Sequence, residues 1–219
     1  MSDIAAAPLL LQGDCMELLS TLPEHSVDFV CCDPPFGLTE IEWDKALGWT
    51  SLWPELKRVL KPTGVTAIFT SGKFTFDTWS SNAKDYKYKW IWVKAQGTDF
   101  LNARRRPMTC TEEVLVFYQG KTKDTWYEPQ MSYGHKPATR IRSPHEKVPR
   151  HYEGEGRSKI ASHVDYINDG SRYPTNVLRY NRVNTSERIH PSQKPVELIA
   201  HLVKSHCPMG GGSLSLIHI

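Results

Sequence analysis

Apolar and polar residues alternate in blocks along the first 120 residues, and these blocks predict an α/β fold. Residues 27–32 form an apolar run with β-branched residues, interrupted only by Asp28, as in a strand buried on both faces of a parallel sheet. In residues 49–60 the apolar side chains recur at helical spacing and mark one helix face. The same reasoning predicts strands over residues 9–12, 65–70, 88–93 and 113–118, and helices over residues 16–22, 74–79 and 195–206. Strands that alternate with helices indicate a sheet with helical crossovers.

The periodicity is lost after Gln119 for nearly seventy residues. A stretch of that length without regular structure is uncommon inside a compact domain and is usually functional or mobile. Residues 121–188 hold 13 Lys and Arg against 8 Asp and Glu, whereas the whole chain has a net charge of only +3. Basic side chains with interleaved tyrosines and histidines suit a phosphate backbone and exposed bases. A solvated polar loop is the alternative interpretation.

Composition narrows the class of protein further. The five cysteines fit neither a disulfide framework nor a zinc-binding pattern, so we expect free thiols in a reducing compartment. Four histidines of the basic segment are spaced by 10, 6 and 12 residues, which matches no compact ligand pattern, and we predict no metal site. No apolar stretch is long enough to span a bilayer, and residues 1–12 lack a basic leader. We therefore expect a cytoplasmic protein with no membrane partner.

The most informative motif is Asp33-Pro34-Pro35-Phe36, which directly follows the predicted buried strand. Ligands bind at the carboxyl ends of the strands in an open parallel sheet. Two prolines fix the backbone, so the Asp33 carboxylate and the Pro34 carbonyl form two fixed acceptors beside the flat ring of Phe36. This set fits a planar base with an exocyclic amino group, because the acceptors can bind both amino hydrogens while the ring stacks on the base. Such acceptors localise the nitrogen lone pair and stabilise the positive charge that develops as the nitrogen attacks.

These four residues resemble the catalytic motif of the amino-group DNA methyltransferases, which methylate adenine N6 or cytosine N4 with S-adenosylmethionine. The Asp form resembles the adenine enzymes, whereas the cytosine enzymes more often carry Ser there. Gly13-Asp14-Cys15 and the hexapeptide His-Pro-Ser-Gln-Lys-Pro at 190–195 are similar to further family elements, in the order of the beta permutation. The resemblance extends to phage and restriction-modification members. It implies a permuted, Rossmann-like methyltransferase sheet, S-adenosylmethionine as cofactor, double-stranded DNA as substrate and a cognate restriction endonuclease as a partner.

The resemblance also implies roles for residues outside the catalytic motif. Asp14 is expected to bind the adenine side of the cofactor, and capping a helix is a compatible second role. His190, Gln193 and Lys194 are expected near the methionine end of the cofactor, where a cation can pair with its carboxylate. A simple loop at the start of the last helix is the alternative for these three residues.

Three consecutive arginines, Arg104, Arg105 and Arg106, stand between two predicted strands. We expect them to contact DNA phosphates, and a solvated basic turn is the alternative. The chain is accordingly divided into a catalytic α/β part (1–120), a target-recognition segment (121–188), a cofactor-proximal motif with its helix (189–208) and an atypical tail (209–219).

The tail departs from the family pattern, in which a strand and an Asp-Pro-Phe-x-Gly-x-Gly loop follow the last helix. Residues 209–219 contain three glycines but no acidic-ended strand and no following helix. We therefore expect a C-terminally truncated methyltransferase with unpaired apolar sheet edges and weak cofactor binding. Cytosine N4 methylation, a substrate other than DNA, and a non-catalytic DNA-binding remnant are the alternative functions.

Overall fold

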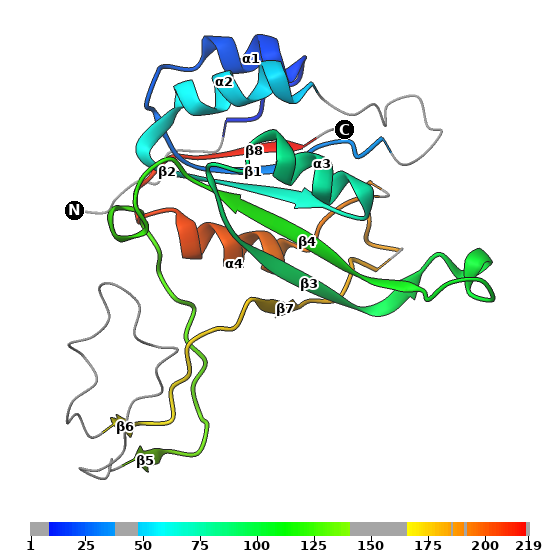
Figure 1. Cartoon of the computed structure of the whole chain (residues 1–219), viewed down its shortest axis with the longest axis vertical. Helices are drawn as coiled ribbons and strands as arrows, with labels where there is room; N and C mark the ends of the chain where they lie inside the picture. The colour runs from blue at the N-terminus through cyan, green and yellow to red at the C-terminus, as the bar shows by residue number, and fades with distance from the viewer. Residues whose placement is uncertain (1–8, 38–47, 141–165, 185, 191, 218–219) are drawn as a thin grey trace. The chain divides into compact units, whose positions relative to one another are not determined.

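Six strands build the central sheet of the protein. They are β1 (Val27–Asp33), β2 (Leu60–Thr70), β3 (Tyr86–Thr98), β4 (Thr109–Phe117), β7 (Val177–Arg179) and β8 (Ser213–Ile217). The computed structural model, which describes residues 9–37, 48–140, 166–184, 186–190 and 192–217, places them in the order β7-β3-β4-β2-β1-β8 (Figure 1). Strand β1 pairs in parallel with both β2 and β8, and β3 pairs in parallel with β7. Strand β4 is antiparallel to β2 and β3, so the sheet is mixed.

Helices cover both faces of this sheet, as the apolar run in β1 predicts. Figure 1 shows α1 (Cys15–Thr21), α2 (Trp49–Val59) and α3 (Lys73–Ser81) on one face and α4 (Val196–His206) on the other. Because side chains alternate along a strand, Val30 and Cys32 pack in the core under α1 and α2, whereas Phe29 and Cys31 pack in the core against α4. Both faces of β1 are therefore buried, which confirms the prediction for residues 27–32.

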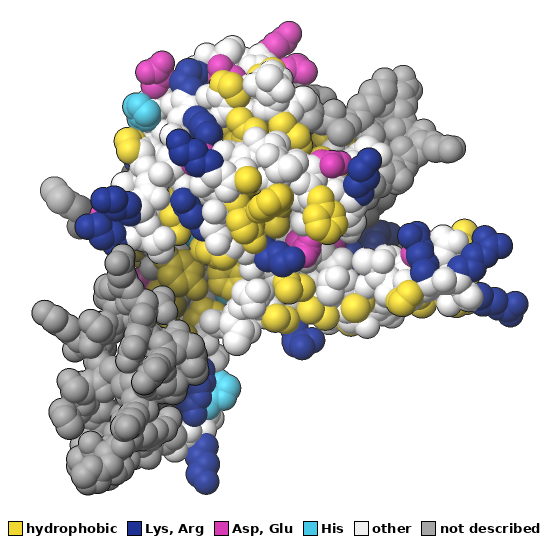
Figure 2. All heavy atoms as spheres, viewed as in Figure 1, with side chains coloured by type: hydrophobic (Ala, Val, Ile, Leu, Met, Phe, Trp, Pro, Cys, Tyr) yellow, Lys and Arg dark blue, Asp and Glu magenta, His cyan; other side chains and the backbone are white. Residues whose placement is uncertain are grey.

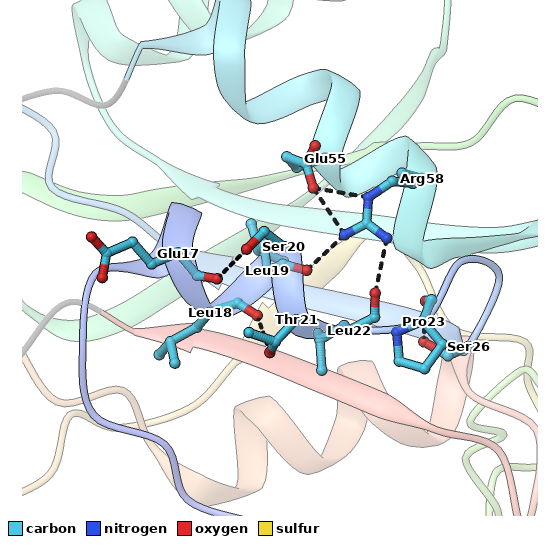
Figure 3. Close-up of polar contacts among 10 residues, drawn as sticks. All are labelled: Glu17, Leu18, Leu19, Ser20, Thr21, Leu22, Pro23, Ser26, Glu55 and Arg58. Atoms are coloured by element: carbon cyan, nitrogen blue, oxygen red, sulfur yellow. Dashed lines mark hydrogen bonds and ion pairs between the residues drawn. The ribbon is translucent and has the colours of Figure 1, made fainter.

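The contact between α1 and α2 depends on one arginine. The Arg58 guanidinium donates to the Leu22 carbonyl at 2.8 Å and to the Leu19 carbonyl at 2.7 Å, which are backbone acceptors at the end of α1 (Figure 3). The Glu55 carboxylate on the same face of α2 accepts from Arg58 Nε at 2.9 Å and holds the guanidinium in place. Arg58 thus satisfies carbonyls that the short helix α1 cannot satisfy itself.

Two predictions about the sheet were wrong. Residues 9–12 are not a strand, and the Leu9 and Leu10 side chains are 78% and 90% exposed. A run of three leucines has enough apolar character for a strand, but a strand forms only where a neighbouring strand offers its edge. The second error concerns the edge of β1, which was expected to be unpaired: β8 pairs with β1 from Phe29 to Asp33. Leu214 and Leu216 alternate with serines and pack against the core, so the tail has the period of a strand.

Part of the basic segment forms a second compact unit. It comprises Gln130–Pro174, whereas Met1–Pro129 and Thr175–Ile219 belong to the unit with the central sheet. Within the described part of this second unit, β5 (Ala138–Arg140) and β6 (Tyr166–Asn168) form an antiparallel pair. A backbone bridge between Ser132 and Arg172 extends the same pairing of its two chain segments. Residues 141–165, which carry three of the four histidines of the basic segment, lie outside the described residues.

Candidate active site

Asp33 is the last residue of β1. At this strand the helical connections switch from one face of the sheet to the other. The connection from β1 to β2 runs through α2 on one face, whereas α4, on the opposite face, leads into β8 (Figure 1). Strands β1 and β8 are parallel neighbours, and Asp33 lies opposite Ile217 in their register. In open α/β sheets, ligands bind at such switch points beyond the carboxyl ends of the strands. Pro34 and Pro35 are buried directly after Asp33 and end the strand.

A row of four alternating charges surrounds the Asp33 carboxylate. Lys194 Nζ lies 2.7 Å from Asp33 Oδ2 and 3.6 Å from Glu112 Oε2. Lys94 Nζ lies 2.5 Å from Glu112 Oε1 and completes the row. All four side chains are at most 15% exposed, so their charges interact in a region of low dielectric constant. We call Asp33, Lys194, Glu112 and Lys94 the charge row.

The charge row sets the protonation of Asp33. Burial raises the pKa of the Asp33 carboxyl above its usual value, and this is the largest influence on it. Lys194 acts in the opposite direction through its charge and its hydrogen bond, whereas the negative Glu112 raises the pKa further. The charge of His190 also lowers it. The carboxyl therefore has a raised pKa, which makes it a better proton acceptor than an exposed aspartate.

One acceptor in the charge row has no hydrogen-bond partner. Glu112 Oε2 is buried and accepts no hydrogen bond from the described residues. A buried carboxylate oxygen without a donor is costly, so the site fits a ligand that brings an N–H group. An amino acid group fits this donor set, because its ammonium can donate to Glu112 while Lys194 faces its carboxylate.

Phe36 is held close to the charge row by other rings. Its ring stacks on Phe74 of α3, with 5.0 Å between centroids and 21° between planes. Lys194 Nζ lies 5.8 Å from the centroid of the Phe36 ring and 5.1 Å from that of Phe69, which are cation–π distances. The Phe36 ring is therefore fixed in orientation beside Asp33, and a substrate base would meet a surface that Phe74 does not cover.

The structure brings together some of the predicted site residues and separates others. Lys194 contacts Asp33 directly, and His190 is close enough to influence it. Gln193 Oε1 instead accepts the Ile189 N–H at 3.0 Å, which closes its own loop. Asp14 is the N-cap of α1 and accepts from two backbone N–H groups of the first turn. Its capping role is confirmed, while its cofactor role stays a prediction.

The three arginines lie away from the charge row, in the turn that connects β3 and β4. Arg104, Arg105 and Arg106 are all exposed. Arg106 forms an ion pair with Asp99 at 2.5 Å. In the described part of the chain, Arg104 and Arg105 form no ion pair. These two remain the candidates for phosphate contacts.

Sequence reasoning missed Lys94 and Glu112, although both leave a signal in the strand pattern. Trp90, Trp92 and Lys94 are buried at every second position of β3, so a lysine continues an apolar row. Glu112 continues the row of Val114 and Val116 on β4 in the same way. A charged residue at a buried strand position requires a partner, and each provides the partner of the other.

A groove with a volume of about 840 Å³ lies beside the charge row. Its wall is formed by Val93, Lys94 and Ala95 within β3, by the end of β7, and by the loop that precedes α4 with the first turn of that helix. The charged side chains of its lining are the basic Lys94, Arg179 and Arg182 and the acidic Glu187 and Glu197.

The described residues contain no group of three or more His, Cys, Asp or Glu side chains placed to hold a metal ion. Among these residues there is also no helix that is both long and apolar enough to cross a membrane.

Comparison with known proteins decides the family. A family model described as DNA methylase, of the N6 and N4 type, matches residues 27–213. The chain belongs to this DNA methylase family. Among the curated relatives, the type II methyltransferase M.BglII of Bacillus subtilis is 24% identical over 216 residues, which cover 90% of this chain and 55% of the relative. The methylase chain thus spans about half the length of that relative.

Solved structures confirm the fold of the methylase. The cytosine-N4-specific PvuII DNA methyltransferase matches with a TM-score of 0.57 and 14% identity, over 93% of this chain and 78% of that chain. A complex of M1.HpyAVI with SAM matches with a TM-score of 0.52 and 20% identity, over 94% of this chain and 80% of that chain. The predicted α/β, Rossmann-like methyltransferase fold is therefore confirmed.

Proposed function

We propose that this methylase transfers a methyl group from S-adenosylmethionine to the N6 amino group of adenine in double-stranded DNA. The observation that carries the proposal is the buried Asp33 carboxylate, fixed by Lys194 at the end of β1 and followed by two buried prolines and Phe36. Family membership supports amino-group methylation of DNA. The Asp in this motif, where cytosine enzymes more often carry Ser, favours adenine.

The proposed reaction uses groups that the chain itself provides. S-adenosylmethionine, when bound, supplies a methyl group activated by a positively charged sulfur. Asp33 and the Pro34 carbonyl accept the two hydrogens of the target amino group and raise the electron density on its nitrogen. The bound cofactor would supply the methyl carbon to this nitrogen, and the electron pair of the carbon–sulfur bond would stay on its sulfur. Asp33, with its raised pKa, takes up the proton that the nitrogen releases.

The remaining residues of the site hold the cofactor and the base. Lys194 and the Glu112 oxygen that accepts no hydrogen bond would bind the amino acid group of S-adenosylmethionine, which fits their charges and hydrogen-bonding capacity. Phe36 would stack on the flipped base, because its ring is already held beside Asp33. Asp14 and His190 would complete the cofactor site from the loops at either side.

DNA would approach along the basic surfaces of the methylase. Arg179 and Arg182, which line the groove beside the charge row, would pair with phosphates of the sugar–phosphate backbone. Residues 121–188, which are rich in Lys, Arg and Tyr, would supply most of the sequence recognition. A cognate restriction endonuclease would cleave the unmodified form of the same sequence.

The test is transfer of tritiated methyl groups to DNA, followed by digestion of the product to nucleosides. We expect the label in N6-methyl-2′-deoxyadenosine. Label in N4-methylcytosine would contradict the choice of adenine, and the absence of label from DNA would contradict the proposed activity. An RNA competitor in the same reaction separates DNA from RNA as substrate.

A further inference from the structure

Strands β3 and β4 extend beyond the rest of the central sheet as a hairpin (Figure 1). Their antiparallel pairing passes Val93 and Thr111 and resumes at Thr98 and Thr109. The turn between them contains the short 3₁₀ helix η1 (Phe100–Asn102). We call residues 99–106 the hairpin tip.

Polar contacts connect the residues of the hairpin tip to one another. Asp99 adopts the left-handed conformation with φ of 72°, which a short polar side chain tolerates better than most. Its carboxylate accepts from Asn102 Nδ2 at 2.7 Å and pairs with Arg106 at 2.5 Å. The N–H groups of Arg105 and Arg106 both donate to the Asn102 carbonyl. These polar contacts all lie within residues 99–106.

Two large apolar side chains project from this polar turn. Phe100 is 77% exposed and Leu101 is 96% exposed. Exposing a phenylalanine and a leucine side by side is unfavourable in water. The tip therefore presents an apolar wedge, formed by Phe100 and Leu101, that has no partner among the described residues of this chain.

The charge beside the wedge indicates what it meets. Arg104 and Arg105 follow Leu101 closely in the chain and are exposed, with no ion pair to any described residue. Figure 2 shows dark blue basic side chains gathered at the end of the hairpin. An apolar wedge flanked by free guanidinium groups matches a base stack flanked by phosphates.

We propose that Phe100 and Leu101 insert between adjacent base pairs of DNA while Arg104 and Arg105 bind the flanking phosphates. This inference rests on DNA being the substrate, as proposed above. Asp99 at the tip follows Lys94 in the charge row by five residue steps along β3 and its end, which at about 3.3 Å per step is about 16 Å. That reach corresponds to about five base steps at 3.4 Å each, so the wedge meets the duplex that carries the target base.

The test compares binding of the full chain to two labelled duplexes of the same sequence, one of them with a single abasic site. A wedge binds better where the stack is already broken, so we expect the unaltered protein to prefer the abasic duplex by about tenfold. The double variant Phe100→Ala, Leu101→Ala should bind both duplexes with nearly equal affinity. Phe76→Ala is the matched control, because Phe76 is also an exposed apolar side chain, 72% exposed on α3, and should keep the preference.

Retention of the preference by the double variant would overturn the wedge. The same holds if the double variant only dissociates a dimer in sedimentation and leaves the preference unchanged, because the tip would then be a contact between copies of this chain. Methyl transfer measured on the same preparations separates this inference from the proposed function. If the unaltered protein transfers methyl groups and the double variant keeps the preference for the abasic duplex, only the wedge is contradicted. If the double variant loses the preference but the unaltered protein transfers no methyl group, only the proposed function is contradicted.

Discussion

Replacing Lys194 by methionine removes the positive end of the pair with Asp33 and keeps most of the side-chain volume. Lys194 Nζ lies 2.7 Å from Asp33 Oδ2, and an opposite charge at such a distance lowers a carboxyl pKa by about one to three units. In the variant, burial and Glu112 remain, and both raise the pKa of Asp33. The pKa of Asp33 should therefore rise by about one to three pH units in Lys194→Met.

Carbon-detected NMR titration of the Asp33 carboxyl measures this change directly and does not require cofactor binding. In the methyl transfer assay, the acid limb of the rate should move to higher pH by the same amount, because the ionised carboxylate is the acceptor. Lys61→Met is the matched control: Lys61 forms a 2.7 Å pair with Asp28 at the opposite end of β1 and should leave the Asp33 titration unchanged. An Asp33 pKa that stays constant or falls in Lys194→Met would refute the role given to the charge row.

The same substitution has a defined effect on stability. Breaking a buried ion pair lowers the unfolding free energy by about 3–5 kcal/mol, which is the loss expected for Lys194→Met. Lys61 is 41% exposed, so Lys61→Met should lower it by less than about 1 kcal/mol. The pKa of Asp33 is higher in the folded state than in the unfolded state. The stability that the titration of Asp33 contributes is therefore fully present at low pH and is lost as the pH rises through the folded-state pKa. The difference between Lys194→Met and the unaltered protein in urea unfolding should therefore grow with pH.

Three further substitutions test separate parts of the structure. Glu112→Gln removes a negative charge that raises the pKa of Asp33, so the same NMR titration should show a lower pKa, and a higher one would contradict the charge row. Asp14→Ala removes the cap of α1 and should lower the unfolding free energy by about 1 kcal/mol, measured in urea. Gly170→Ala places a Cβ 2.4 Å from the His135 carbonyl oxygen at a φ of +97°, so limited proteolysis of Gln130–Pro174 should accelerate. Gly134→Ala, at a φ of +80° with open space around its Cβ, is the control for crowding and should have the smaller effect.

Local patterns predicted the elements that bury a large apolar surface. The strand at residues 27–32 and the helix at residues 49–60 have the correct type and place, because burial on one or both faces dictates their periodicity. The leucines at 9–11 mislead, since periodicity says nothing about which strand edges are free. The antiparallel hairpin of β3 and β4 was not predicted either, because pairing direction depends on contacts distant in sequence.

The candidate site likewise contains residues that a local motif predicts and residues that only the fold brings together. Asp33 and Phe36 were predictable because a short contiguous motif at a strand end carries their chemistry. Lys194 was predicted to contact the cofactor, and its ion pair with Asp33, 161 positions away in the chain, was not foreseen. Lys94 and Glu112 come together only through the register of β3 and β4, which the sequence pattern does not specify.

The central claim is that Asp33 carries methyl transfer, and the most direct measurement compares Asp33→Asn with Asp28→Asn. Both aspartates lie on β1 and each forms a 2.7 Å ion pair with a lysine, so Asp28→Asn controls for the loss of a charged pair on the same strand. The single-turnover rate of methyl transfer to DNA should fall at least about 100-fold in Asp33→Asn, the loss typical of removing one group that stabilises developing charge. Asp28→Asn should stay within about threefold of the unaltered rate, less than 1 kcal/mol in the barrier. Equal rates in the two variants would contradict the assignment of the reaction to Asp33.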